Sequence, residues 1–141
     1  MANNIELTSR MDNNEEYPMN AFCTVDTSDP VGQKVVFNAL SDALPLAQYM
    51  DTDIKVCDIM VEPGKRKNRS DGSYSTCMNT YLIDVDGNAY FSQSDGVFRS
   101  ILNLMRIYRN GLRDTPNGYL TMRCVETVLN TGNTLKKLIL V

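Results

Sequence analysis

The dipeptide Asp86-Gly87 lies between two runs of β-forming residues, TCMNTYLID at 76–84 and NAYFS at 88–92. Asp-Gly between such runs predicts a tight β-hairpin, because glycine adopts the positive φ that the turn requires. A third run, IKVCDIMV at 54–61, precedes the hairpin, and the following Pro63-Gly64 predicts that this strand ends there. The chain from residue 54 onward is therefore expected to begin with an antiparallel sheet.

A helix and two further strands are predicted after the hairpin. Ser94 or Asp95 is expected to cap a helix over 95–109, since its apolar residues recur every three or four positions. Strands are expected at 119–128 and 134–141. The order strand, strand, strand, helix, strand, strand is that of the OB fold, a five-stranded Greek-key barrel. We therefore predict a mainly β, OB-fold-like antiparallel barrel over 54–141, with these helix residues facing it: Phe98, Ile101, Leu102 and Met105.

The N-terminal part is predicted to extend this barrel. Residues 1–16 are polar and acidic without periodicity, which is typical of a flexible terminus. Residues 17–26 are expected to add a strand. Asp29 and Pro30 predict a helix start, because aspartate caps helices and proline suits the first helical position, and this helix should end before Pro45. The prediction is one domain over 17–141.

The chain of 141 residues contains no histidine. This removes the usual general base, the Ser-His and Cys-His nucleophile pairs and most catalytic zinc sites. The sequence has no glycine-rich phosphate loop, and the spacing of its acidic residues does not select a catalytic pair of carboxylates. We therefore expect neither catalysis nor a cofactor. The cysteines have no C-x-x-C spacing, which predicts reduced, mostly buried thiols without metal or disulfide at Cys23, Cys57, Cys77 and Cys124.

Net charge is −3, but the charge is unevenly distributed along the chain. Residues 1–30 carry six acidic side chains against one basic, whereas residues 101–141 carry six basic against two acidic. Such asymmetry is a hint of a nucleic-acid surface, although solvated helix faces also carry lysine and arginine. The polar N-terminus and the lack of a long apolar run predict a cytoplasmic protein without a membrane span.

The loop after the first barrel strand is the strongest local indication of a binding site. It places four cations within residues 65–69, and in an OB fold it would join strands one and two. Cations beside aromatic rings suit sequence-tolerant binding of single strands, while a solvated surface loop is the alternative. On strands two and three, alternation places Tyr90 and Phe91 on opposite faces, so at least one aromatic should be solvent-facing. The candidate nucleic-acid-binding residues are Lys65, Arg66, Lys67, Arg69, Tyr74, Tyr81, Tyr90, Arg99 and Arg123.

Several segments together resemble a known family. IDVDGNAY at 83–90 matches a hairpin of the type ID-x-DG-x-x-Y, and SDGVFRS at 94–100 matches a Ser-x-Gly-[Val/Ile]-[Phe/Tyr]-x-Ser helix start. The helix ends in Ile-Tyr at 107–108, the chain closes with KKLIL at 136–140, and an Asn-Ala-containing helix lies at 36–40. In these features the chain resembles the single-stranded-DNA-binding proteins encoded by some tailed bacteriophages.

The resemblance implies a non-catalytic protein that binds single-stranded DNA in phage replication or recombination. Its partners would be single-stranded DNA and other replication or recombination proteins, and a homo-oligomer is left open. The alternative is a protein-interaction module or inhibitor that uses the acidic N-terminus and a sheet edge. A small enzyme is the third hypothesis.

Overall fold

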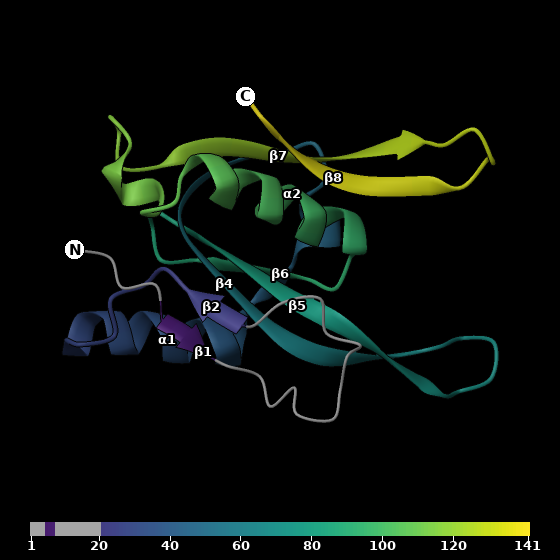
Figure 1. The fold of residues 1–141 in the computed structure, drawn as a ribbon, viewed down its shortest axis with the longest axis horizontal. Helices are drawn as coiled ribbons and strands as arrows, with labels where there is room; N and C mark the ends of the chain where they lie inside the picture. Colours follow the sequence, from purple (N-terminus) through teal and green to yellow (C-terminus); the bar gives the residue numbers. More distant parts are fainter. Residues whose placement is uncertain (1–4, 8–20) are drawn as a thin grey trace.

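A strongly curled, mainly antiparallel sheet with two helices forms the molecule in a computed structural model, which describes residues 5–7 and 21–141 (Figure 1). In these residues eight strands form one sheet in the order β1-β2-β4-β5-β6-β3, and β7 pairs with both β4 and β8. The strands are β1 (Ile5–Leu7), β2 (Ala21–Cys23), β3 (Leu44–Pro45), β4 (Asp53–Lys67), β5 (Tyr74–Asp84), β6 (Ala89–Ser92), β7 (Leu120–Val128) and β8 (Thr134–Leu140). The helices are α1 (Pro30–Asp42) and α2 (Asp95–Ile107), with short 3-10 turns η1 (Leu46–Tyr49) and η2 (Leu112–Asp114).

The prediction of a mainly β chain with a helix between the third and fourth barrel strands is confirmed at this level. The predicted number of five strands differs from the structure, in which further strands join the same sheet. Within the described residues, β8 pairs with β7 alone and the outer edge of β6 pairs with the two-residue β3, so the curled sheet stays open between β6 and β8. Of the strand predicted over 17–26, residues 21–23 form β2, residues 24–26 are not in a strand, and residues 17–20 lie outside the described residues. Residues 5–7 of the acidic segment pair as β1 with β2, and the rest of that segment also lies outside.

Helix α2 packs on the inner side of the curled sheet. Ser94 caps it, with its hydroxyl accepting a hydrogen bond from the Val97 N–H at 3.3 Å. Gly96 is required where α2 meets β8, because a Cβ there would collide with the Lys136 carbonyl oxygen. As predicted, the apolar face of α2 joins the main hydrophobic core, which Phe98 and Ile101 enter fully and Leu102 and Met105 partly.

Helix α1 covers the opposite side of the sheet, below β5 and β6 in Figure 1. It begins as predicted: Asp29 accepts a hydrogen bond from the Gly32 N–H at 2.9 Å, and Pro30 occupies the first helical position. Its half-buried valines and Ala39 form a second hydrophobic cluster with Met60, Tyr81 and Ile83 of the sheet. The outer face of β5 and β6 is therefore not solvent-exposed beneath α1.

The strand β4 is longer than the sequence predicts. It continues through Pro63-Gly64, which pair with Met78 and Cys77 of β5, up to Lys67. Within the described residues the pairing of β4 with β2 ends at Val61. Proline is tolerated at a strand edge, because it has no N–H to donate to a neighbouring strand. The predicted loop 65–73 is thereby shortened to residues 68–73.

All four cysteines are buried, as the sequence predicts, and none is paired in a disulfide within the described residues: Cys23, Cys57, Cys77 and Cys124. Burial raises each pKa, and for Cys57 burial and the neighbouring Asp58 carboxylate raise it to about 11. We therefore expect slow reaction with a thiol reagent at pH 8 in the folded protein and reaction of all four thiols after denaturation without reductant. A colorimetric thiol titration measures both, and fewer than four reactive thiols in denaturant would contradict the prediction.

Candidate nucleic-acid interface

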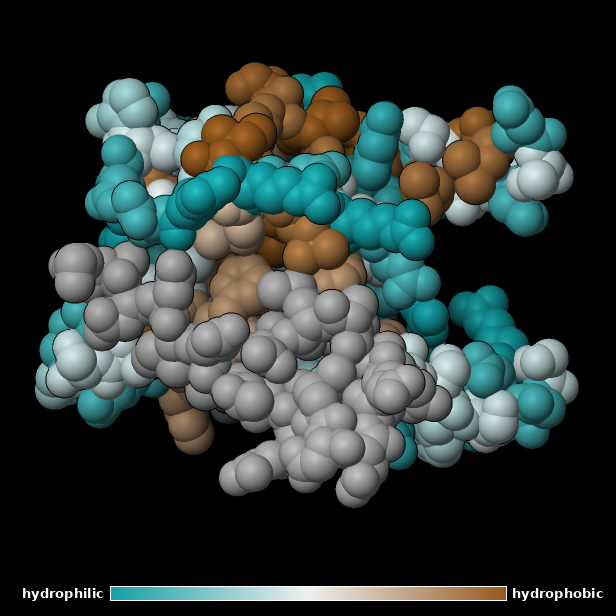
Figure 2. Space-filling view, viewed as in Figure 1, coloured by the Kyte–Doolittle hydropathy of each residue, from teal (hydrophilic) through white to brown (hydrophobic). Residues whose placement is uncertain are grey.

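Two hairpins project from the same side of the molecule, and one of them carries four of the six predicted basic residues. We define the β4–β5 arm as residues 65–76 and the β7–β8 arm as residues 125–137; they are the teal and yellow ribbons at the right of Figure 1. In the space-filling view the ends of the arms stand apart, and hydrophilic residues cover α2 and the region where the arms meet the body (Figure 2). The ends of the arms are thus open to solvent, and the β7–β8 arm also exposes the apolar side chains of Val128, Leu129 and Leu135.

The β4–β5 arm presents cations and an aromatic ring on one face. Side chains alternate along a strand, so Lys65 and Lys67 share a face and Arg66 lies on the other. Tyr74 is directly opposite Lys67 in the strand register and therefore shares its face. Its side chain is 66% exposed, which leaves the ring available for stacking on a base.

Arg66 has a different role from the neighbouring lysines. Its Nη1 donates a hydrogen bond to the Gln93 carbonyl oxygen at 3.0 Å, and its Nη2 lies 3.8 Å from the Asp95 carboxylate. The Gln93 side chain in turn donates to the Lys65 carbonyl oxygen at 3.1 Å. These contacts attach the arm to the turn that precedes α2 and fix its direction.

The end of the β4–β5 arm is a turn closed by its own hydrogen bonds. The Asn68 N–H donates to the Ser73 carbonyl oxygen at 2.7 Å, and Asp71 accepts from both the Ser73 N–H and its hydroxyl. These two bonds lower the pKa of Asp71. Arg69 is exposed in this turn, so three of the four predicted cations belong to a regular strand and only Arg69 to a loop.

The second arm and α2 add further positive charge. Lys136 is half-buried opposite Glu126, while Lys137 and Arg99 of α2 are exposed. Residues 65–76, 95–99 and 125–137 together hold seven cationic side chains against three acidic ones, a formal net charge of +4. The region of the arms is therefore basic in a chain whose net charge is negative.

Tyr81 is not available to bind a nucleic acid, which corrects the prediction from sequence. It is 7% exposed beneath α1, and its ring lies 5.2 Å from that of Phe91. Its hydroxyl donates to the Glu62 carboxylate at 3.3 Å, and burial together with this carboxylate raises the pKa of Tyr81 to about 12. The ring is a core residue of the second cluster.

Tyr90 is likewise engaged within the protein. It is half-buried against the main core, its hydroxyl donates to Asp84 at 3.2 Å, and the Tyr49 ring meets it edge-on at 5.1 Å. Burial is the largest cause that raises its pKa, followed by the Asp84 charge. Since Phe91 is also half-buried, none of Tyr81, Tyr90 and Phe91 is exposed, contrary to the prediction that at least one of them faces solvent.

Arg123 is separated from the arms by its position and by its partner. Its Nε donates to the Asp53 carboxylate at 2.7 Å, and this contact raises its pKa. Asp53 is the first residue of β4, whereas Lys65 is near the end of that strand. The structure thus groups six of the nine predicted residues around the arms, with Arg66 bonded internally, and places Tyr81, Tyr90 and Arg123 away from them.

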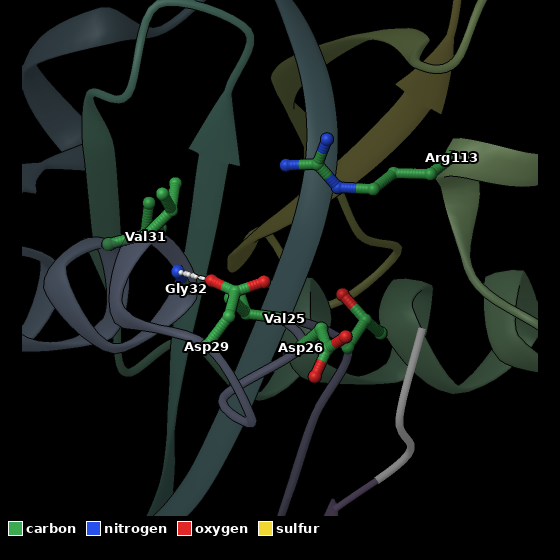
Figure 3. Close-up of a pocket in the computed structure, with 8 residues that line it drawn as sticks. Val25, Asp26, Asp29, Val31, Gly32 and Arg113 are labelled. Atoms are coloured by element: carbon green, nitrogen blue, oxygen red, sulfur yellow. Dashed lines mark hydrogen bonds between the residues drawn. The ribbon is translucent and has the colours of Figure 1, made fainter. Parts of the chain in front are cut away.

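Away from the arms, a pocket of about 240 Å³ lies between the start of α1 and Arg113 (Figure 3). Its polar groups already have partners: Asp29 caps α1, and Asp26 accepts from the Ser28 N–H and hydroxyl. Arg113 donates to the buried Asp58 carboxylate from Nη2 at 2.6 Å and from Nε at 2.9 Å. This pocket is therefore explained by helix capping and by an internal ion pair.

Sequence reasoning did not select Gln93 as part of the interface. Gln93 supports the arm through its main chain and amide, and no local pattern distinguishes such a residue from other turn residues. Lys136 and Lys137 could be found only as part of the basic C-terminal segment.

The part of the chain that the structure describes contains no helix long and apolar enough to cross a membrane.

Comparison of the chain with family models, with curated proteins and with solved structures finds no match.

Proposed function

We propose that this protein binds single-stranded DNA between its two arms, without catalysis and without reading the base sequence. The observation that carries the proposal is the single face of the β4–β5 arm on which Lys65, Lys67 and the exposed Tyr74 lie together. Lysines can neutralise phosphates along a flexible strand, and an exposed ring can stack on any base. This combination favours a single strand, because the bases of a duplex are already stacked.

The proposal includes an OB-fold-like architecture. Support comes from the continuous pairing of β6, β5, β4, β7 and β8, from α2 between β6 and β7, and from the open side of the sheet, since OB folds are partly open barrels. In such a fold the loops joining strands one and two and strands four and five flank the ligand, and these correspond to the ends of the two arms. The resemblance in sequence extends the proposal to a role in phage replication or recombination.

A protein contact through a sheet edge is less well supported. The edge of β6 is occupied by β3, and the edge of β8 is joined to α2, where the Leu138 N–H donates to the Ser100 hydroxyl at 3.0 Å. The acidic segment that this alternative also needs lies largely outside the described residues. Single-strand binding is therefore the function we put to the test.

Competition between nucleic acids provides the direct test. In a gel-shift assay at low salt, we expect a labelled single strand to be displaced by an unlabelled single strand and not by a duplex of equal length. An RNA competitor in the same assay measures the preference for deoxyribose. Equal competition by the duplex, or no shift of the single strand at low salt, would contradict the proposal.

The exposed ring of Tyr74 is expected to contribute by stacking. Replacing Tyr74 by alanine should weaken single-strand binding by about 1–3 kcal/mol and leave the salt dependence of the affinity almost unchanged. The matched control is Tyr74→Phe, which keeps the ring and should keep the affinity. Fluorescence anisotropy at several salt concentrations measures both quantities, and equal losses in the two variants would show that stacking is not the cause.

A further inference from the structure

A cavity of about 340 Å³ lies where the two arms join the body of the protein. Four separate parts of the chain line it: the segment around β3 and η1, the end of β6, the β4–β5 arm through Arg66, and the β7–β8 strands through Cys124 and Lys136. It occupies the place where the curled sheet is open, since β6 and β8 are not paired with each other in the described residues. The cavity therefore opens toward the proposed path of the strand.

Two cations of the cavity come from different arms. The Arg66 guanidinium is held by the Gln93 carbonyl oxygen at 3.0 Å, yet an arginine has five N–H donors, and this bond uses one of them. Lys136 is half-buried on the other side. Asp95 lies 3.8 Å from Arg66 and Glu126 is opposite Lys136 in the register, but none of the residues that line the cavity is acidic. The lining itself is therefore positively charged and suited to a phosphate.

The remaining wall is mainly apolar. Phe91 uses part of its ring to contact Tyr81, with the planes tilted by 50°, and is only half-buried. Pro45 pairs with Phe91 in the strand register, and Ala47 is exposed beside it. A planar base packs well on such a surface, because aromatic and apolar side chains can contact its face.

Polar groups border this wall. The Gln93 amide nitrogen is committed to the Asn79 side chain at 3.0 Å and to the Lys65 carbonyl oxygen, which leaves its amide oxygen as an acceptor. The Ser92 hydroxyl accepts from the Ser94 N–H at 3.1 Å and retains a proton to donate. One acceptor and one donor thus lie at the edge of the apolar wall.

We propose that this inter-arm cavity holds one nucleotide unit of the bound strand, with its base against Phe91 and Pro45 and its phosphate between Arg66 and Lys136. The volume is at the lower end of the roughly 300–1,000 Å³ found for small-molecule sites, which fits one nucleotide. A base can enter only after it has left its neighbours in the stack, and this is cheapest for a single strand. The inference rests on the proposed function and adds to it a defined subsite that selects unstacked nucleotides.

Deoxycytidine 5′-monophosphate tests the cavity without any strand. We expect millimolar concentrations to shift the backbone amide NMR signals of residues 92–94 in a saturable way, with little change at the ends of the arms. The Ala47→Trp variant should fill the cavity from its exposed rim and abolish these shifts. The matched control is Gln48→Trp, which adds the same ring at the neighbouring exposed residue, outside the lining, and should leave the shifts unchanged.

Strand affinity then separates the two proposals. We expect Ala47→Trp to weaken single-strand binding about tenfold, as for one lost stacking contact, and to flatten the salt dependence by at most about 0.7, the contribution of one phosphate. If the wild type binds single strands but the mononucleotide does not shift residues 92–94, or shifts them equally in Ala47→Trp, the subsite is wrong and the proposed function stands. If the wild type binds no single strand at low salt, the proposed function fails and the strand subsite with it.

Discussion

Replacing Arg113 by alanine is expected to lower the free energy of unfolding by about 3 kcal/mol. The guanidinium donates two hydrogen bonds to the Asp58 carboxylate, which is 1% exposed. When the guanidinium is removed, the principal hydrogen-bond donor left to the Asp58 carboxylate is the Thr24 hydroxyl, at 3.0 Å. Removing one partner of a buried pair costs about 3–5 kcal/mol, and the lower end applies because the Arg113 side chain is itself 56% exposed.

A double-mutant cycle separates this pair from general packing. Asp58→Asn removes the buried charge, so Arg113→Ala should cost much less in that background than in the wild type. The measurement is urea denaturation, with the slope of the transition unchanged so that the midpoint reports stability. A loss below about 1 kcal/mol for Arg113→Ala, or equal losses in both backgrounds, would show that the Asp58 carboxylate does not depend on the guanidinium.

Features decided by neighbouring residues could be predicted from the sequence. Asp29 and Ser94 cap the two helices, and Asp86-Gly87 turns between β5 and β6, with Gly87 at a φ of 87°. Each depends on atoms within a few residues: a carboxylate or hydroxyl that accepts from the first turn of a helix, or a residue without a Cβ in a left-handed turn. The apolar spacing of α2 likewise predicts which side faces the core.

Features decided by distant residues could not be predicted in this way. Pro63 and Gly64 indicate the end of a strand locally, but eleven register pairs with β5 continue β4 through them. Arg113 and Asp58 are 55 residues apart, and neither has a local pattern that predicts the pair. The β6–β8 opening also depends on long-range pairing, because β3 occupies the edge of β6.

The candidate site shows the same division. The positions of Lys65, Lys67 and Arg69 on one hairpin follow from the sequence, whereas the availability of the aromatics does not. The alternation of side chains along β5 gives the sheet face on which Tyr81 lies. Whether that face is exposed to solvent depends on α1, which begins about fifty residues earlier and covers it. Tyr74 is exposed because it lies beyond the part of the sheet that either helix covers.

The triple variant Lys65→Ala, Lys67→Ala, Arg69→Ala is expected to flatten the salt dependence of single-strand binding by about 2 units of log affinity per log salt. Each phosphate neutralised on a single strand contributes about −0.7 to this slope, because one condensed counterion is partly released. Arg66 is left unchanged, since it bonds to the Gln93 carbonyl oxygen and its loss would also loosen the arm. The measurement is a salt titration of single-strand affinity by fluorescence anisotropy.

The control must change the net charge equally without altering the arms. Lys34→Ala, Lys55→Ala, Arg109→Ala also removes three exposed cations, which lie on α1, at the start of β4 and after α2. A loss of general attraction between protein and DNA would weaken binding in both triple variants, whereas direct phosphate contacts flatten the slope only in the arm variant. An unchanged slope in the arm variant would contradict phosphate binding by this arm and direct attention to Arg99, Lys136 and Lys137, the cations on the other side of the inter-arm space.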